Sequence, residues 1–406
     1  MLNFIENFLF KNRLKGCVYN EKKISYFLNP TGWAKPLWKN GLIPPLDGSD
    51  GDVGVRVPEF YMCVKDTGTK YQLWISDFNI DGTFTRVHPF IISHTKTMTR
   101  TREDGKEEVF SACIKPDDTR YLGGNKNSSV AAVKLQGKPR TGISYDKANE
   151  FCVNRGNWVT MIDYLEYCAI QALCYIEYAS FDNQAALNTN LTSDGFKQGG
   201  LGAGVTNLNW DRWTVFNDNN PIVQTYWTAE HNIGNGSTNG DHYELGNYNT
   251  DGSNLNTYPA VYRGILNFFG DIWTFIRDVV IINRNANYNS VYLLKKGVNH
   301  ADITIDNIQD KCYFIGDQAN SNNFITEFDF RFGPYFIPNK VGTNKKADYN
   351  WIRGNNGQDT DKAVCVLLLG GRANLGSAAG SGRFDSDYVQ SVSGASVGFF
   401  TTVKLD

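Results

Sequence analysis

The chain has 406 residues, of which 41% are hydrophobic and 14% aromatic, and this is enough apolar material for a sizeable core in one to three domains. It carries 40 basic and 42 acidic side chains for a net charge of −2, so no basic surface is expected to neutralise a nucleic-acid backbone. No segment approaches the ~18 consecutive apolar residues that span a membrane. The composition argues against nucleic-acid binding and membrane insertion.

Residues 1–85 are predicted to form a small β-rich N-terminal module. Its first ten residues are mostly apolar, but positive charges follow rather than precede them and no small-residue cleavage site is present. We therefore expect an amphipathic docking segment and not a secretory signal. Glycine and proline then make residues 41–52 a dense series of turns. Two runs rich in aromatic and branched side chains, 60–64 and 71–75, predict strands.

Eight cysteines are scattered along the chain without a C-x-x-C pair, which argues against a structural zinc site. Because no secretory signal is expected, we predict that they are reduced, buried and apolar in character rather than paired in disulfides. They are Cys17, Cys63, Cys113, Cys152, Cys168, Cys174, Cys312 and Cys365.

A strand is predicted over 86–92, and two helices follow further along the chain. Ser144 is a suitable N-cap for the first helix, which we expect to end near residue 153. Thr160 and Asp163 form a capping-box pattern for the second helix. The apolar residues of this second helix recur at helical spacing and predict that one face lies against a core.

The remainder of the chain alternates loop-rich and apolar segments. Residues 184–258 are rich in asparagine, glycine and threonine and indicate a long functional insertion or a set of short strands. Residues 262–278 combine aromatic side chains and glycines, and are predicted to be core scaffold. The apolar run 363–369 predicts a strand buried on both faces. Apolar residues at 397–405 predict a last strand that returns beside the strand at 86–92.

Several groups of residues, taken in order and spacing, carry a resemblance to a known family. They are 142–158 followed by Phe181-Asp-Asn-Gln184, the block 262–278, Leu369-Gly-Gly-Arg372, and Gly380-Ser-Gly-Arg-Phe384 with Gly398-Phe-Phe400. Together they resemble the phage variant of the C-type lectin fold, found in the major tropism determinant and in related tail-fibre and prophage receptor-binding proteins.

The resemblance implies an α+β fold, with a C-type lectin-like domain and long loops over residues 86–406 behind the N-terminal module. It also implies a homotrimer that is synthesised in the host cytoplasm and assembled into a phage virion, where the N-terminal module contacts other virion proteins. The formylglycine-generating oxidases share this fold, but they bind copper through two neighbouring C-terminal cysteines. Here Cys312 and Cys365 lie far apart in the sequence, so no enzymatic activity is expected.

No metal or other cofactor is expected. The five histidines lack a short-range ligand pattern, although acidic residues beside His231 and His242 leave a metal site there as an alternative. The Glu-Pro-Asn, Gln-Pro-Asp and Trp-Asn-Asp strings of calcium-dependent sugar-binding lectins are absent from the sequence.

The C-terminal tract, residues 349–396, is the candidate recognition surface. Its apolar strands alternate with aromatic, amide and arginine side chains, which bind at low entropic cost when a rigid scaffold carries them. In the family that the chain resembles, the corresponding stretch is displayed on such a scaffold. The predicted receptor-binding residues are Trp351, Arg353, Asn355, Asn356, Asp359, Arg372, Asn374, Arg383, Asp385, Asp387, Tyr388 and Gln390.

The sequence therefore predicts a phage tail-fibre or head-fibre protein that acts as a receptor-binding adhesin for a bacterial surface glycan or protein. The alternative is a purely structural virion protein that uses the lectin fold as an interaction scaffold. Exposed aromatic clusters in the C-terminal tract would favour the adhesin, and burial of the tract against another virion protein would favour the structural role.

Overall fold

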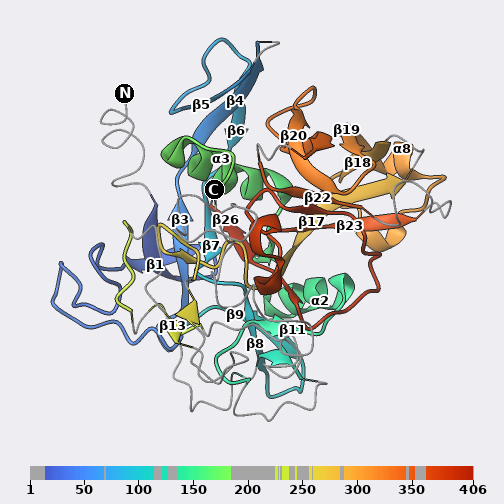
Figure 1. Cartoon of the computed structure of the whole chain (residues 1–406). Coiled ribbons are helices and arrows are strands. Elements are labelled where there is room, and N and C mark those ends of the chain that lie inside the picture. The colour runs from blue at the N-terminus through green and yellow to red at the C-terminus, as the bar shows by residue number, and fades with distance from the viewer. Residues whose placement is uncertain are drawn as a thin grey trace.

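The computed structural model describes residues 14–67, 70–113, 121, 123–126, 135–183, 225–226, 228, 231–236, 243–244, 256–257, 259–283, 288–343, 347–352 and 363–405. Most of the regular structure within these residues is β-sheet, and two sheets of six and nine strands form its centre. Two longer helices, α2 (Tyr145–Arg155) and α3 (Tyr164–Tyr178), pack on the sheets (Figure 1). The few helices and many strands agree with an α+β or β-rich protein.

The six-stranded sheet joins segments from both ends of the chain. β26 pairs antiparallel with β7, with Val403 opposite Ile91, so the last strand returns beside the second half of the strand predicted at 86–92. That predicted strand is divided at His88 and Pro89 into β6 (Thr85–Val87) and β7, which belong to different sheets. β3 pairs with β1 on one side and with β7 on the other, and the boundary predicted at residue 86 therefore falls between strands of one sheet. In spatial order the strands are β12 (Thr160–Met161), β26 (Thr401–Lys404), β7 (Phe90–Ser93), β3 (Asp52–Val57), β1 (Lys15–Asn20) and β2 (Lys23–Phe27).

The nine-stranded sheet is built from the second half of the chain around β17 and β23, which pair antiparallel. A further short strand, β25 (Val397–Gly398), pairs with β17 outside the main order. In spatial order the other strands are β19 (Cys312–Ala319), β18 (Tyr288–Leu294), β17 (Trp273–Asn283), β23 (Val364–Leu369), β24 (Phe384–Asp385), β22 (Tyr349–Trp351), β20 (Asn323–Asp329) and β21 (Ile337–Gly342).

The two helices cover opposite faces of the nine-stranded sheet. Alternate side chains of β23 point to opposite faces: Val366 packs in the same core cluster as Phe151 of α2, and Leu367 in the same cluster as Tyr167 of α3. β23 is thus buried on both faces, as its continuous apolar run predicted. Residues 262–278 also lie in the core, where Phe268, which stacks on Tyr167, is fully buried.

The helix starts follow local capping rules. The Ser144 hydroxyl accepts a hydrogen bond from the Lys147 N–H at the start of α2, as predicted. α3 begins one residue after Asp163, and its capping box pairs Asp163 with Glu166. The predicted pair of Thr160 and Asp163 was wrong, because Thr160 belongs to strand β12.

Smaller elements surround this centre. The runs at 60–64 and 71–75 form paired strands, as predicted. The small elements are β4 (Phe60–Asp66), β5 (Tyr71–Ser76), β6 (Thr85–Val87), β8 (Met98–Thr101), β9 (Glu107–Phe110), β10 (Gly124–Asn125), β11 (Arg140–Thr141), β13 (Tyr243–Glu244), β14 (Asn256–Thr257), β15 (Val261–Tyr262), β16 (Ile265–Leu266), η4 (His300–Asp302), α8 (Ile308–Lys311) and η5 (Ala373–Ala378).

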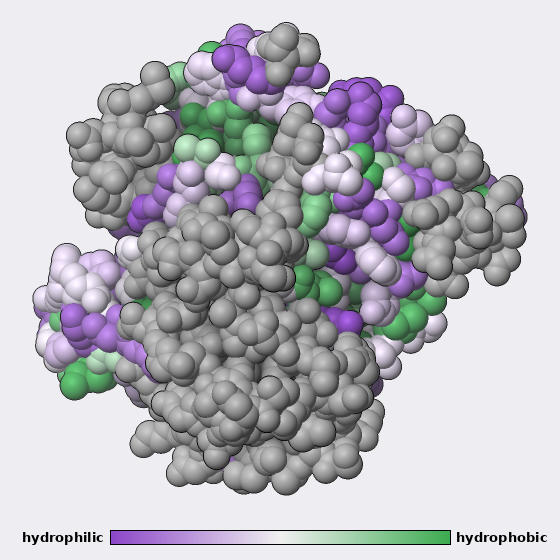
Figure 2. All heavy atoms as spheres, in the orientation of Figure 1, coloured by the Kyte–Doolittle hydropathy of each residue, from purple (hydrophilic) through white to green (hydrophobic). Residues whose placement is uncertain are grey.

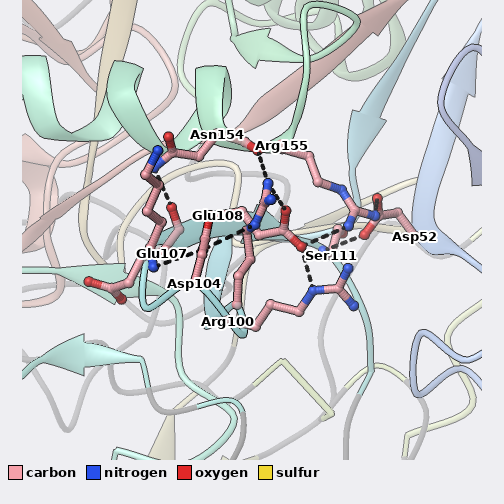
Figure 3. A network of polar contacts seen from close by, with 10 residues as sticks. Asp52, Arg100, Asp104, Glu107, Glu108, Ser111, Asn154 and Arg155 are labelled. Carbon is pink, nitrogen blue, oxygen red and sulfur yellow. Dashed lines mark hydrogen bonds and ion pairs between the residues drawn. The ribbon is translucent and has the colours of Figure 1, made fainter.

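A buried ion-pair network joins the end of α2 to the six-stranded sheet and to the β8–β9 hairpin. Figure 3 shows Arg155 reaching Asp52 of β3 at 2.8 Å and Glu108 of β9 at 3.1 Å. Arg100 of β8 approaches the same Glu108 carboxylate at 2.7 Å. Asp52 also accepts a hydrogen bond from the Ser111 N–H. One guanidinium thus holds three elements together.

Candidate binding surface

The described part of the C-terminal tract contributes β22, β23 and β24 to the nine-stranded sheet. β24 pairs with β23 on one side and with β22 on the other, so Asp385 lies opposite Leu368 and beside Trp351. The chain then continues along β23, where the Val366 N–H donates to the Tyr388 carbonyl at 2.9 Å. Backbone pairing therefore gathers Trp351, Asp385 and Tyr388 on one part of the sheet.

The guanidinium of Arg383 lies among three aromatic rings. Its central carbon is 4.5 Å from the ring centre of Tyr349, 5.5 Å from that of Trp273 and 5.7 Å from that of Trp351. Tyr349 and Trp351 are two positions apart on β22, so they project from the same face. A desolvated guanidinium is attracted to aromatic faces. We name Trp273, Tyr349, Trp351 and Arg383 the aromatic platform.

Trp351 is the most exposed member of the aromatic platform. It is 36% exposed, Tyr349 is half-buried, and Trp273 and Arg383 are buried. Arg383 is itself enclosed, so its contact with the indole limits how the ring can reorient. An aromatic ring that is both accessible and held in place is suited to stacking against a ligand, since little conformational freedom is lost on binding.

Asp385 is buried next to the aromatic platform and does not face solvent. Burial raises the pKa of Asp385 to about 7, although the nearby Arg383 charge opposes the rise. Burial also lowers the pKa of Arg383 to about 10. The Asp385 carboxylate accepts a hydrogen bond from the Asp387 N–H at 2.9 Å. Arg383 and Asp385 therefore support the surface from within, and we do not expect either side chain to contact a receptor directly.

Three of the predicted residues are half-buried beside the platform. Arg372 precedes η5, and its Nη1 donates to the Ser396 hydroxyl at 3.3 Å. Burial lowers the pKa of Arg372 and raises that of Tyr388. Asp387 precedes Tyr388 in the chain and is half-buried as well. These side chains keep part of their surface available.

Gln390 anchors the tract to the start of α2. Its Oε1 lies 2.8 Å from Nδ1 of the buried His300, and its amide nitrogen donates to the Asp146 carboxylate. The Tyr145 N–H donates to the Gln390 carbonyl at 3.3 Å. Sequence reasoning selected Gln390 for receptor binding but missed these internal partners, because His300 and Asp146 are distant in the chain.

A pocket of about 580 Å³ opens beside this junction. Its lining is mostly polar and charged, and it comes from the β1–β2 turn, the start of α2 and the loop after it, β12, the N-cap of α3, β17, the end of β18 and the loop after it, and β26. The lining includes Tyr145, Asp146, Trp158, Asp163, Arg277, Asp278, His300 and Lys404. Sequence patterns did not indicate this pocket, since its residues meet only through the tertiary fold.

Three carboxylates meet at the start of α3, next to the pocket. Asp163 pairs with Lys404 at 2.7 Å, and Glu166 accepts a hydrogen bond from the Thr402 hydroxyl at 2.8 Å. Burial raises the pKa of Glu166 to about 8 and that of Asp278 to about 6, and in both cases the Asp163 charge adds to the rise. The charged form of Glu166 therefore destabilises the folded protein relative to its neutral form.

We expect Glu166→Gln to gain stability relative to the wild type as the pH rises from about 5 to about 8. A carboxyl group whose folded pKa is raised binds more protons in the folded state than in the unfolded state, so its ionisation lowers the free energy of unfolding. Glutamine stays neutral and keeps an oxygen that can accept from Thr402. Urea unfolding of both proteins across this pH range measures their free energies of unfolding. A difference between the two free energies that does not change with pH would contradict the prediction.

Some of the predicted residues lie outside the part of the chain that the structure describes. Most of the predicted insertion at 184–258 also lies outside it. For Asn374, the backbone belongs to η5 but the side chain is not described. The predicted site residues outside the described part are Arg353, Asn355, Asn356 and Asp359.

The cysteines are buried and free of disulfides, as predicted. Burial raises the pKa of Cys312 to about 11 and that of Cys152 to about 12, which is the opposite of the shift that activates a thiol. Among the described residues no group of three or more His, Cys, Asp or Glu side chains is placed to hold a metal ion. His242, one of the two histidines of the alternative metal site, lies outside them. None of the described helices has the length and apolar character needed to cross a membrane.

Comparisons with known proteins do not show to which family the chain belongs. No protein-family model and no curated protein matches the chain. Among solved structures, the chain is similar to one named "Major Tropism Determinant U1 Variant", with 11% sequence identity and a TM-score of 0.24, over 86% of this chain and 72% of that chain. A TM-score this low does not show a shared fold, and the C-type lectin fold stays a prediction.

Proposed function

We propose that the chain is a phage virion fibre protein that acts as a receptor-binding adhesin for a bacterial surface molecule. The observation that carries the proposal is the aromatic platform, in which the exposed indole of Trp351 contacts the buried guanidinium of Arg383. The half-buried Arg372, Asp387 and Tyr388 belong to the same tract and add polar groups. The order and spacing of motifs that resemble phage receptor-binding proteins support the same assignment.

The chemistry of this surface fits a glycan or a polar protein segment. The Trp351 ring supplies an apolar face for stacking, and Asp387 and Arg372 supply an acceptor and donors from the same tract. Binding would use shape, stacking and hydrogen bonds, without a metal ion or a covalent step. A homotrimer, attached to the virion through its N-terminal module, would present several copies of the surface, so that modest single-site affinity gives strong attachment.

The rival proposal is a structural virion protein, and one observation favours it. Arg383 and Asp385, selected for recognition, are buried inside their own subunit, as expected if the tract mainly stabilises the fold. In that case Trp351 would contact another virion protein and not a bacterium. The two proposals differ in whether the isolated protein binds cells.

Purified full-length protein in excess is expected to inhibit adsorption of the phage that carries it to cells of its host. The free protein would occupy the receptor that the fibre uses, and inhibition should rise with its concentration to saturation. Counting unadsorbed particles measures the effect, with bovine serum albumin as the control protein. Adsorption that stays unchanged at every concentration would favour the structural protein.

A further inference from the structure

An exposed apolar loop follows the edge strand β2 of the six-stranded sheet. Trp38 is 75% exposed and Ile43 is 68% exposed, and Leu42 and Phe27 are also exposed. Figure 2 shows a small apolar patch among hydrophilic residues on the part of the surface from which this loop projects in Figure 1. Single exposed apolar residues are common, but a group of large ones on one short segment marks an interaction surface.

Hydrogen bonds hold the loop in one conformation, and this conformation exposes its apolar side chains. The Leu37 N–H donates to the Leu42 carbonyl at 2.7 Å, and the Gly41 N–H donates to the Leu37 carbonyl at 2.8 Å. Gly41 has a φ of 71°, which glycine adopts without strain. The Asn29 amide donates to the Pro36 carbonyl at 2.7 Å and ties the loop to the end of β2.

A groove of about 480 Å³ runs between this loop and the end of β2. Its apolar lining includes Phe27, Leu28, Leu37 and Trp38, and Lys15 lies at its rim. The Lys15 ammonium is 5.5 Å from the centre of the Phe27 ring. Because Lys15 is the first residue of β1, β1 begins at a residue that lines the groove.

The N-terminal segment has the composition to fill an apolar groove. Residues 2–10 contain six large apolar side chains and a single charge, Glu6. Phe4, Ile5, Phe8 and Leu9 fall on one face at helical spacing. The Glu6 charge is opposite in sign to Lys15 and Lys39 of the groove lining.

We propose that residues 2–10 of the chain bind in the groove of the same subunit and cover Phe27 and Trp38, the two exposed apolar side chains that line it. Only residues 11–14 separate this segment from Lys15 at the rim, and four extended residues span about 13 Å. Such a short tether gives an effective concentration of about millimolar or more, which favours the chain's own segment over one from another subunit. The contact removes an apolar face from water on both partners.

The first test is a full-length double variant, Phe4→Ser with Phe8→Ser. Amide hydrogen exchange in residues 37–43 should become about tenfold faster, because the cover over the loop is lost. The matched control, Asn3→Ser with Asn7→Ser, changes the other face of the segment. It should leave the rate of amide exchange in residues 37–43 as in the wild type. Equal exchange in the wild type and in both variants would overturn the proposal.

A reciprocal variant tests the groove side and does not depend on the first. Trp38→Ser with Phe27→Ser, at two residues of the groove lining, should speed trypsin cleavage after Lys11 and Arg13, since residues 2–10 would lose their binding surface. Trp74→Ser, at an exposed tryptophan on β5, should leave the cleavage rate unchanged. Protection of residues 37–43 that disappears on dilution would place the segment of a second copy in the groove and overturn binding within one subunit.

Discussion

Arg155→Met is expected to lower the free energy of unfolding by about 3–5 kcal/mol. The side chains of Asp52 and Glu108 are only 4% and 7% exposed, so removal of the guanidinium leaves carboxylates buried without their cation. Arg100 still approaches Glu108, and the loss therefore falls mainly on Asp52. Methionine is similar in length to the arginine stem, so packing changes little. Denaturant unfolding of both proteins measures the effect.

Two further variants test whether the loss of stability comes from an unpaired buried charge or from a general disruption of packing. Arg102→Met removes an exposed member of the same network, which lies 3.4 Å from Asp104, and should cost less than about 1 kcal/mol. Asp52→Asn added to Arg155→Met should restore much of the loss, because no unpaired charge then remains. The proposed role of Arg155 would be contradicted by equal effects of Arg155→Met and Arg102→Met.

The loss in Arg155→Met should also depend on pH. Burial already raises the pKa of Asp52, and Arg155 is the main influence that lowers it. Without Arg155 the folded pKa rises further above the unfolded value, so the folded protein favours the protonated acid. The deficit should therefore be small at acid pH and grow as the pH rises through the folded pKa.

Features set by neighbouring residues were predictable from the sequence. Ser144 caps α2 because a hydroxyl can reach an N–H within one turn, and that requires no knowledge of the fold. The run 363–369 predicted a strand buried on both faces because all its side chains are apolar. The start of α3 was misplaced by three residues because Thr160 and Asp163 also match the capping pattern, while pairing of Thr160 with Thr402 draws it into a sheet.

Features that depend on distant residues were not predictable in the same way. Arg383 looked like a surface arginine among glycines, and only the pairing of β24 with β22 places it beside Tyr349 and Trp351. Gln390 looked like a free amide, but its partners come from α2 and η4. Composition identifies the tract as rich in binding side chains, and the tertiary fold decides which of them face outward.

Trp351→Ala is expected to weaken binding to host cells by about 30-fold, which corresponds to about 2 kcal/mol for the loss of an aromatic anchor. The indole is the most exposed ring of the aromatic platform, and alanine removes the stacking face. Trp351→Phe keeps an aromatic ring near Arg383 and should retain part of the affinity. Thermal unfolding of the variants shows whether any loss of binding comes from loss of structure.

Equilibrium binding of labelled full-length protein to cells of the phage host tests the central claim most directly, because it asks whether the surface around Trp351 contacts an outside molecule. Wild type, Trp351→Ala and Trp74→Ala are compared, the last as an exposed tryptophan on β5. The expected result is saturable binding that Trp351→Ala weakens about 30-fold and Trp74→Ala leaves unchanged. Equal affinity of all three proteins, or no binding by the wild type, would contradict the proposed adhesin.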